Sequence, residues 1–120
     1  MKVKCINNPK PYEALTVGKE YVVLAIEFYD KTEFSKFLGD FVVYRLKSDD
    51  GVVIPFPSNL FEITLNRLPS SWVSYRRNNE AYSILPRTWA RDYFWDDYYN
   101  DNADVIQAFR TEEKLILSEA

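Results

Sequence analysis

Residues 42–56 read VVYRLKSDDGVVIPF, and this stretch decides the fold. Two runs, residues 41–46 and 52–56, are rich in β-branched and aromatic residues, a composition typical of strands. Between them lies Ser48-Asp-Asp-Gly51, and Asp and Gly tolerate the positive φ angles of tight hairpin turns. Pro55 cannot donate a hydrogen bond to a neighbouring strand, so it places the second run at a sheet edge or a bulge. The stretch therefore predicts an antiparallel β-hairpin.

Three further strands are predicted around this hairpin. MKVKCI, residues 1–6, alternates between the two sides of a strand. EYVVLAIEFY, residues 20–29, is dense in β-branched and aromatic residues, and FEITL, residues 61–65, forms a short last strand. Residues 57–60 predict one tight helical turn, whereas residues 30–40 predict a polar loop. The first 65 residues thus predict five short strands.

This order of elements resembles an SH3-like barrel of small bacterial and phage accessory proteins. The residues that carry the resemblance are KCI at 4–6, LTVGKEYVVL at 15–24, VVYRLKSDDGVVIPF at 42–56 and SNLFEI at 58–63. The resemblance implies a five-stranded, strongly bent antiparallel barrel over residues 1–66. It implies little about activity, since such barrels host many functions.

Residues 67–120 predict a hairpin and two short helices. Residues 71–76 alternate like a strand, residues 77–80 form a turn, and residues 81–85 return. Thr88 is a candidate cap for a helix over residues 89–99, and Asp101 or Asn102 for a last helix. Leu115-Ile-Leu117 is apolar all round, so it packs on both sides, frays or becomes a strand. The fold class is therefore mainly β with C-terminal helices (α+β), the second part packing on the barrel as one structural unit.

Composition excludes several functional classes. The chain has 120 residues, no histidine and one cysteine, Cys5, which we interpret as a small buried hydrophobe. Without histidine, the commonest metal ligand and general base near neutral pH is missing, so we expect no metal, no cofactor and no enzymatic activity. The net charge of −3 argues against nonspecific binding to nucleic acids. MKVKCINN lacks the apolar core of a signal peptide, so a cytoplasmic protein without a membrane segment is expected.

Charge and aromatic residues are concentrated in RDYFWDDYYND, residues 91–101, which holds five aromatic residues and four aspartates. From residue 92 to residue 104 there are five aspartates and no base. Trp89 and Phe94 are expected in the core. The predicted partner-binding residues are Tyr93, Trp95, Asp96, Asp97, Tyr98, Tyr99 and Asp101. Tyrosine and tryptophan suit interface centres, and the aspartates would attract a basic partner; the alternative is an ordinary solvated helix surface.

The same aspartates also allow a second interpretation. Asp92 and Asp96 stand four residues apart, so on a helix they and Asp97 could act as acid and base or hold a hard cation. The segment is not a calcium-loop sequence, and no second acidic cluster completes a site. A catalytic or metal-binding role is therefore the weaker interpretation.

Two functions remain open. Residues 94–101, FWDDYYND, followed by a closing helix, are similar to C-terminal segments of bacterial toxin-immunity proteins. That resemblance implies a non-enzymatic protein-binding module, an immunity or inhibitor protein that neutralises a basic toxin or effector; phage-encoded inhibitors fit the same features. The alternative is an SH3-like protein associated with nucleic acid through an arginine and aromatic patch. Its residues are Tyr75, Arg76, Arg77 and Tyr82.

Overall fold

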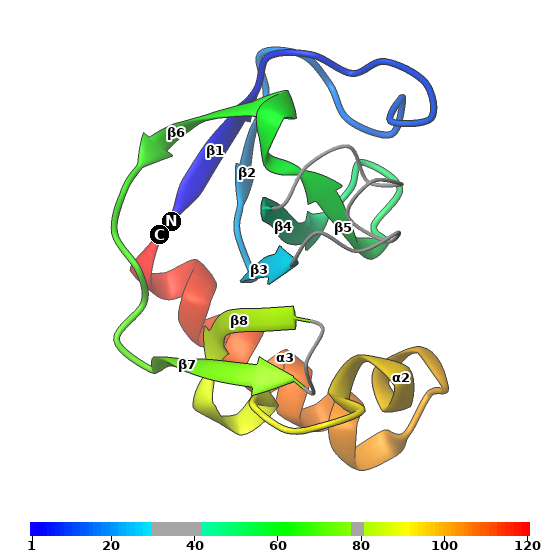
Figure 1. Cartoon of the computed structure of the whole chain (residues 1–120), viewed down its shortest axis with the longest axis vertical. Coiled ribbons are helices and arrows are strands. Elements are labelled where there is room, and N and C mark those ends of the chain that lie inside the picture. Colours follow the sequence, from blue (N-terminus) through cyan, green and yellow to red (C-terminus); the bar gives the residue numbers. More distant parts are fainter. Residues whose placement is uncertain (30–41, 78–80) are drawn as a thin grey trace.

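Figure 1 shows the protein as a computed structural model, and the structure describes residues 1–29, 42–77 and 81–120. The loop predicted at residues 30–40 and most of the turn predicted at residues 77–80 lie outside the described residues. The described strands form two antiparallel sheets, and two α-helices follow them. The predicted fold class, mainly β with C-terminal helices, is confirmed.

The smaller sheet has β1 (Lys2–Cys5) between β2 (Glu20–Val22) and β6 (Phe61–Leu65). The larger sheet has the order β5-β4-β3-β8-β7. Its strands are β3 (Ala25–Tyr29), β4 (Val42–Lys47), β5 (Val53–Pro57), β7 (Trp72–Arg77) and β8 (Ala81–Pro86). Because β8 pairs with β3, with Ile84 opposite Ile26, the larger sheet contains strands from both halves of the chain (Figure 1).

The single strand predicted at residues 20–29 is wrong, since β2 and β3 belong to different sheets. Val23 donates its N–H to the Met1 carbonyl, whereas Leu24 donates to the Arg45 carbonyl. The two side chains are buried in different cores, so the chain bends where it passes from one sheet to the other. Neither sheet closes on itself within the described ranges, and the predicted five-stranded barrel is not confirmed.

The hairpin of β4 and β5 has the predicted turn. The Gly51 N–H donates to the Ser48 carbonyl and the Ser48 N–H donates to the Val52 carbonyl, both at 2.9 Å. Gly51 has a φ of 77°, a conformation that glycine adopts without steric strain. Pro55 lies in β5, which is an edge strand as predicted. The predicted helical turn is also present, as the 3₁₀ helix η1 (Ser58–Leu60).

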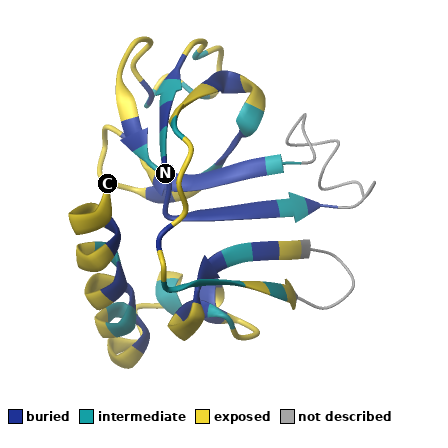
Figure 2. Ribbon diagram, turned by 90° about the vertical axis from the view of Figure 1, so that its left-hand side faces the viewer, coloured by how far each residue is buried: buried dark blue, intermediate teal, exposed yellow. Residues whose placement is uncertain are grey.

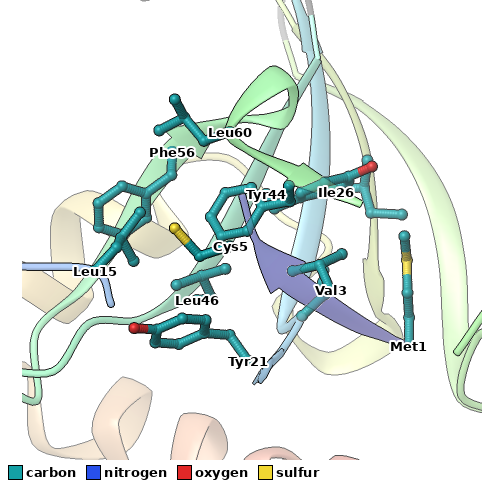
Figure 3. Packing of buried hydrophobic residues seen from close by; sticks show 12 residues of the cluster. Met1, Val3, Cys5, Leu15, Tyr21, Ile26, Tyr44, Leu46, Phe56 and Leu60 are labelled. Carbon is teal, nitrogen blue, oxygen red and sulfur yellow. The ribbon is translucent and has the colours of Figure 1, made fainter. Parts of the chain in front are cut away.

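Most of the buried apolar side chains among the described residues form two hydrophobic cores. The sheet core lies between the two sheets (Figure 3) and includes Val3, Cys5, Leu15, Leu46 and Phe56. The helix core lies between the other face of the larger sheet and the helices, and α3 turns its buried side toward it (Figure 2). Its residues are Leu24, Ala25, Val53, Leu85, Trp89, Phe94, Trp95, Val105, Phe109 and Ile116. The larger sheet is therefore covered on both faces.

The helices differ in their bounds from those predicted. Trp89 ends the 3₁₀ helix η2 (Arg87–Trp89), and α2 begins only at Phe94 (Phe94–Tyr99). The Thr88 hydroxyl caps no helix but donates to Glu112 at 3.2 Å. Asn102 caps α3 (Ala103–Glu119), because its side-chain oxygen accepts from two backbone N–H groups of the first turn. Residues 115–117 stay helical, with Ile116 buried and the two leucines exposed.

Hydrogen bonds to Asp49 connect the β1–β2 connection and β2 to the β4–β5 turn. The Thr16 hydroxyl and Lys19 ammonium donate to its carboxylate at 2.6 Å, and the Tyr21 hydroxyl donates at 2.8 Å. The hydrogen bonds from Lys19, Thr16 and Tyr21, in that order, lower the pKa of Asp49 from 3.8 to about 2. Because the pKa of Asp49 is lower in the folded protein than in the unfolded chain, its carboxylate stabilises the fold at pH values above its ordinary pKa. This stabilisation is lost as the pH falls through the pKa of the folded protein.

We therefore expect Asp49→Asn to lower the free energy of unfolding at about pH 6, by about 1 kcal/mol or more. The difference from the parent protein should shrink between about pH 4 and pH 2, where the Asp49 carboxylate takes up its proton. Urea denaturation at several pH values measures both. Asp50→Asn, at the neighbouring exposed position of the turn, is the control and should stay within about 0.5 kcal/mol of the parent. A difference for Asp49→Asn that does not vary with pH would contradict the assignment.

Candidate functional site

An aromatic platform lies beneath α2. The Trp89 ring lies between Phe94, at a centroid distance of 5.5 Å, and Phe109, at 5.1 Å, and both pairs are stacked. The Trp89 indole N–H donates to the Ala108 carbonyl at 3.2 Å, so its polar atom is satisfied in the interior. Trp89 and Phe94 are buried, as predicted. The platform joins η2, α2 and α3 into one packed unit.

Trp95 was predicted to contact a partner, but its side chain is only 6% exposed. It packs edge-on against Trp89 at 5.6 Å, and the Arg45 guanidinium lies over its ring at 4.2 Å. The first two residues of α2 both face inward. Phe94 lies against Trp89 and Arg91, and Trp95 lies against Trp89 and against Arg45 of β4. Trp95 is therefore a core residue that positions α2.

A buried ion pair connects α2 to the larger sheet. Arg45 of β4 and Glu27 of β3 are 5% and 0% exposed, and Arg45 Nε lies 2.6 Å from Glu27 Oε1. The Tyr29 hydroxyl donates to the other oxygen of Glu27. Arg45 Nη1 donates to the Tyr99 hydroxyl at 2.7 Å, and that hydroxyl donates to the Val53 carbonyl. Tyr99 is thereby tied to β4 and β5 through its polar end.

Glu27 and Arg45 were not among the residues predicted to form a site. Each is the one charged residue within an otherwise apolar part of its strand, in AIEFY and in VVYRL. A charge at such a position is the available signal, since charged residues are rarely buried without a partner. Burial raises the pKa of Tyr99 above 10 although Arg45 acts to lower it, so the phenol keeps the proton that it donates to Val53.

The remaining predicted residues lie at the surface of α2 and of the turns on either side of it. We call Tyr93, Asp96, Asp97, Tyr98, Tyr99 and Asp101 the α2 face. Tyr93 and Tyr99 are 65% and 46% exposed, Asp96 and Asp101 are exposed, and Asp97 and Tyr98 are half-buried. Asp97 pairs with Arg91 at 2.8 Å. Tyr93 and Asp101 have φ angles of 64° and 59°, so both stand in left-handed turns at the ends of α2.

Three residues of the α2 face meet other elements at a groove. It has a volume of about 460 Å³, and its lining includes Val52, Tyr98, Tyr99, Asp101, Ile106 and Arg110. These residues come from the β4–β5 turn, α2, the α2–α3 turn and α3. We call it the hairpin–helix groove. Its tyrosines and Asp101 were predicted from the sequence, whereas Val52, Ile106 and Arg110 were not, because only the fold brings the β4–β5 turn beside α3.

Within the described residues, the aspartates of the carboxylate interpretation do not come together as a site. Asp92 precedes α2, so it does not share a helix face with Asp96, and it accepts a hydrogen bond from the Tyr75 hydroxyl. Asp97 is held by Arg91. Among the residues that the structure describes, no three histidine, cysteine, aspartate or glutamate side chains gather so that they could hold a metal ion.

The alternative nucleic-acid patch is divided by the sheet. Tyr75 and Arg76 are neighbours in β7, so their side chains point to opposite faces. Tyr75 packs against the helix core, and its hydroxyl donates to Asp92. Arg76 stands opposite Tyr82 of β8, whose ring lies 5.7 Å from Phe28. The Arg77 side chain is outside the described part of the structure, so only Arg76 and Tyr82 are placed together.

Comparison with known proteins does not assign the chain. No protein-family model, no curated protein and no solved structure matches it. In the part of the chain that the structure describes, none of the helices combines the length and apolar character needed to cross a bilayer. Function is therefore inferred from the geometry of the chain itself.

We expect Arg45→Met to destabilise the protein by about 3–5 kcal/mol, because the Glu27 carboxylate would stay buried without its cation. Urea denaturation measures the loss. The double variant Glu27→Gln with Arg45→Met removes both charges and should lose less than Arg45→Met alone. If the free energy of unfolding of Arg45→Met lies within about 1 kcal/mol of that of the parent protein, the ion pair does not hold α2 in place.

Proposed function

We propose that this protein is a non-enzymatic protein-binding module, an immunity or inhibitor protein that neutralises a basic toxin or effector through the α2 face. One observation carries the proposal. Although Phe94 and Trp95 at the start of α2 are buried, Tyr93 just before the helix and Tyr99 at its end keep 65% and 46% of their surface exposed. Large rings that remain in water on a firmly packed helix are candidates for interface anchors.

The packing beneath the α2 face supports this role. Tyr99 is fixed through its hydroxyl, and the Tyr98 ring packs on Phe109 at a centroid distance of 4.6 Å. Side chains that are already ordered lose less conformational entropy on binding. A partner would therefore meet rings that hold their positions before contact.

The charges of the α2 face support a basic partner. Asp97 is paired with Arg91, but Asp96, Asp101 and Asp104 are exposed and belong to none of the ion pairs between described residues. Several unneutralised carboxylates on one segment attract a cationic protein and raise its association rate. Reversal of one of them should have the opposite effect.

An SH3-like scaffold and a cytoplasmic site of action belong to the same proposal. The strand order β2-β1-β6, the meander of β3, β4 and β5, and the turn η1 before β6 support the SH3-like resemblance. The only cysteine, Cys5, is free and buried, which fits a compartment in which disulfides are rare. A sequence without histidine supports the non-enzymatic part.

The test compares affinity capture by the parent protein with capture by Tyr93→Asn combined with Asp96→Lys. Asparagine tolerates the left-handed backbone at position 93, so the first change removes the ring without straining the turn. We expect the parent protein to retain a basic protein from the lysate of its native host, and the variant to lose it. With the captured protein in hand, association should slow about tenfold or more, and its dependence on salt should weaken.

Glu13→Lys is the matched control for charge reversal. Glu13 is exposed in the β1–β2 connection, which lies at the end of the molecule opposite α2 (Figure 1). The Glu13→Lys variant should capture the same protein as the parent. A captured protein that is acidic, or that the α2 variant retains at parental affinity, would refute the proposal.

One observation favours the alternative function. Arg76 and Tyr82 face each other across β7 and β8, both exposed, and this pair could stack and neutralise a nucleotide. Fluorescence anisotropy with a labelled oligouridine tests it. Binding at physiological salt that Arg76→Gln reduces at least tenfold would favour the nucleic-acid function, whereas no binding by the parent protein would exclude it.

A further inference from the structure

The hairpin–helix groove has preformed walls. Val53 and Phe109 line it and are buried, so they form its base. Tyr99 donates to the Val53 carbonyl, and the Tyr98 ring lies 4.6 Å from Phe109 and 5.2 Å from Tyr99. A volume of about 460 Å³ is within the range of protein ligand sites. The groove is therefore open to a side chain without prior repacking.

Apolar surface is exposed along the groove. Val52 is 49% exposed beside the glycine of the β4–β5 turn, and Ile106 of α3 is half-buried on the other side. A large aliphatic side chain placed between them would remove its own surface and theirs from water, which stabilises a complex. The groove thus favours an aliphatic side chain at its centre.

Some of the charged residues that line the groove form an ion pair, and others do not. Lys47 pairs with Glu113 at 2.8 Å, so these two lining charges neutralise each other. Asp101 is exposed, and none of the ion pairs within the described residues includes it. Arg110 also lines the groove and is likewise in none of these ion pairs, so the described lining offers one carboxylate, Asp101, and one guanidinium to a partner. Charge complementarity therefore selects a cation beside Asp101.

We propose that the groove binds an extended segment of the protein partner in which a lysine or arginine stands next to a large aliphatic residue. The aliphatic side chain lies between Val52 and Ile106, and the cation approaches Asp101 alongside the Tyr98 ring, where a cation–π contact adds to the ion pair. This inference rests on the proposed function, because it takes the occupant to be a protein. It places the main contact with that protein in the groove and not on the exposed surface of α2.

The probe is a short capped peptide with an Arg-Leu pair between Gly-Ser spacers, titrated into the ¹⁵N-labelled protein. We expect the amide resonances of Val52, Asp101 and Ile106 to shift. Two comparison peptides, with Glu-Leu and with Arg-Ser in place of Arg-Leu, should bind at least about fivefold more weakly. Absence of shifts at about 5 mM Arg-Leu peptide, or shifts confined to other residues, would overturn the proposal.

Two variants probe the two halves of the groove. Asp101→Asn removes only the charge, since asparagine also tolerates the φ of 59°, and Val52→Ser removes exposed apolar surface. Each should weaken the Arg-Leu peptide at least about fivefold. Glu13→Gln, in the β1–β2 connection and outside the groove lining, is the control and should stay within about twofold at physiological salt, which screens distant charges. Unchanged affinity in both groove variants would also overturn the proposal.

The same variants separate this inference from the proposed function. If Tyr93→Asn with Asp96→Lys loses the captured partner but Asp101→Asn and Val52→Ser retain it at parental affinity, the α2 face binds and the groove proposal fails. If the Arg-Leu peptide shifts the groove resonances but no basic protein is captured, the groove binds such segments and the proposed function fails.

Discussion

The buried ion pair between Arg45 and Glu27 is the interaction on which the placement of α2 depends. Removing two charges from water is unfavourable, and only a complete set of partners offsets it. Here the partners come from different parts of the chain: Tyr29 of β3 for the carboxylate, and Trp95 and Tyr99 of α2 for the guanidinium. The larger sheet therefore specifies more than an apolar surface for the helix. It offers a cation that Trp95 and Tyr99 contact in the orientation that α2 adopts, and in this orientation Tyr93 and Tyr99 keep an exposed side.

An isolated α2 would not be a helix. It has six residues, and helices this short are unstable in water without tertiary contacts. Its conformation comes from the aromatic platform, where Trp89 lies between Phe94 and Phe109, and from the left-handed turns at Tyr93 and Asp101. The α2 face and the hairpin–helix groove are thus products of long-range packing. The groove combines residues of the second half of the chain with the β4–β5 turn of the first half.

Local signals in the sequence were enough to predict the β4–β5 hairpin, the η1 turn, the β7–β8 hairpin and a helix starting near Asn102, because turn and cap chemistry acts within a few residues. The division of residues 20–29 into β2 and β3 was missed, since every residue of that run suits a strand and only the two cores reveal the bend. Trp95 was misplaced for a related reason: its neighbour Asp96 and the following tyrosines suggest a surface, while the cation above its ring comes from β4. The groove could be predicted only in part, because Val52 and Ile106 are brought together by tertiary structure.

The pairing of β8 with β3 also determines the order in which this protein becomes complete as the ribosome makes it. A nascent chain that has reached η1 and β6 can already pair β3 with β4, but the other edge of β3 has no strand beside it until β8 has been translated. During that interval the edge can pair with other chains. The Arg45 guanidinium also lacks its contacts with Trp95 and Tyr99 until these residues are translated, after β8. This edge of β3 therefore stays without its strand partner until the C-terminal third of the chain, which begins with β8, has been made.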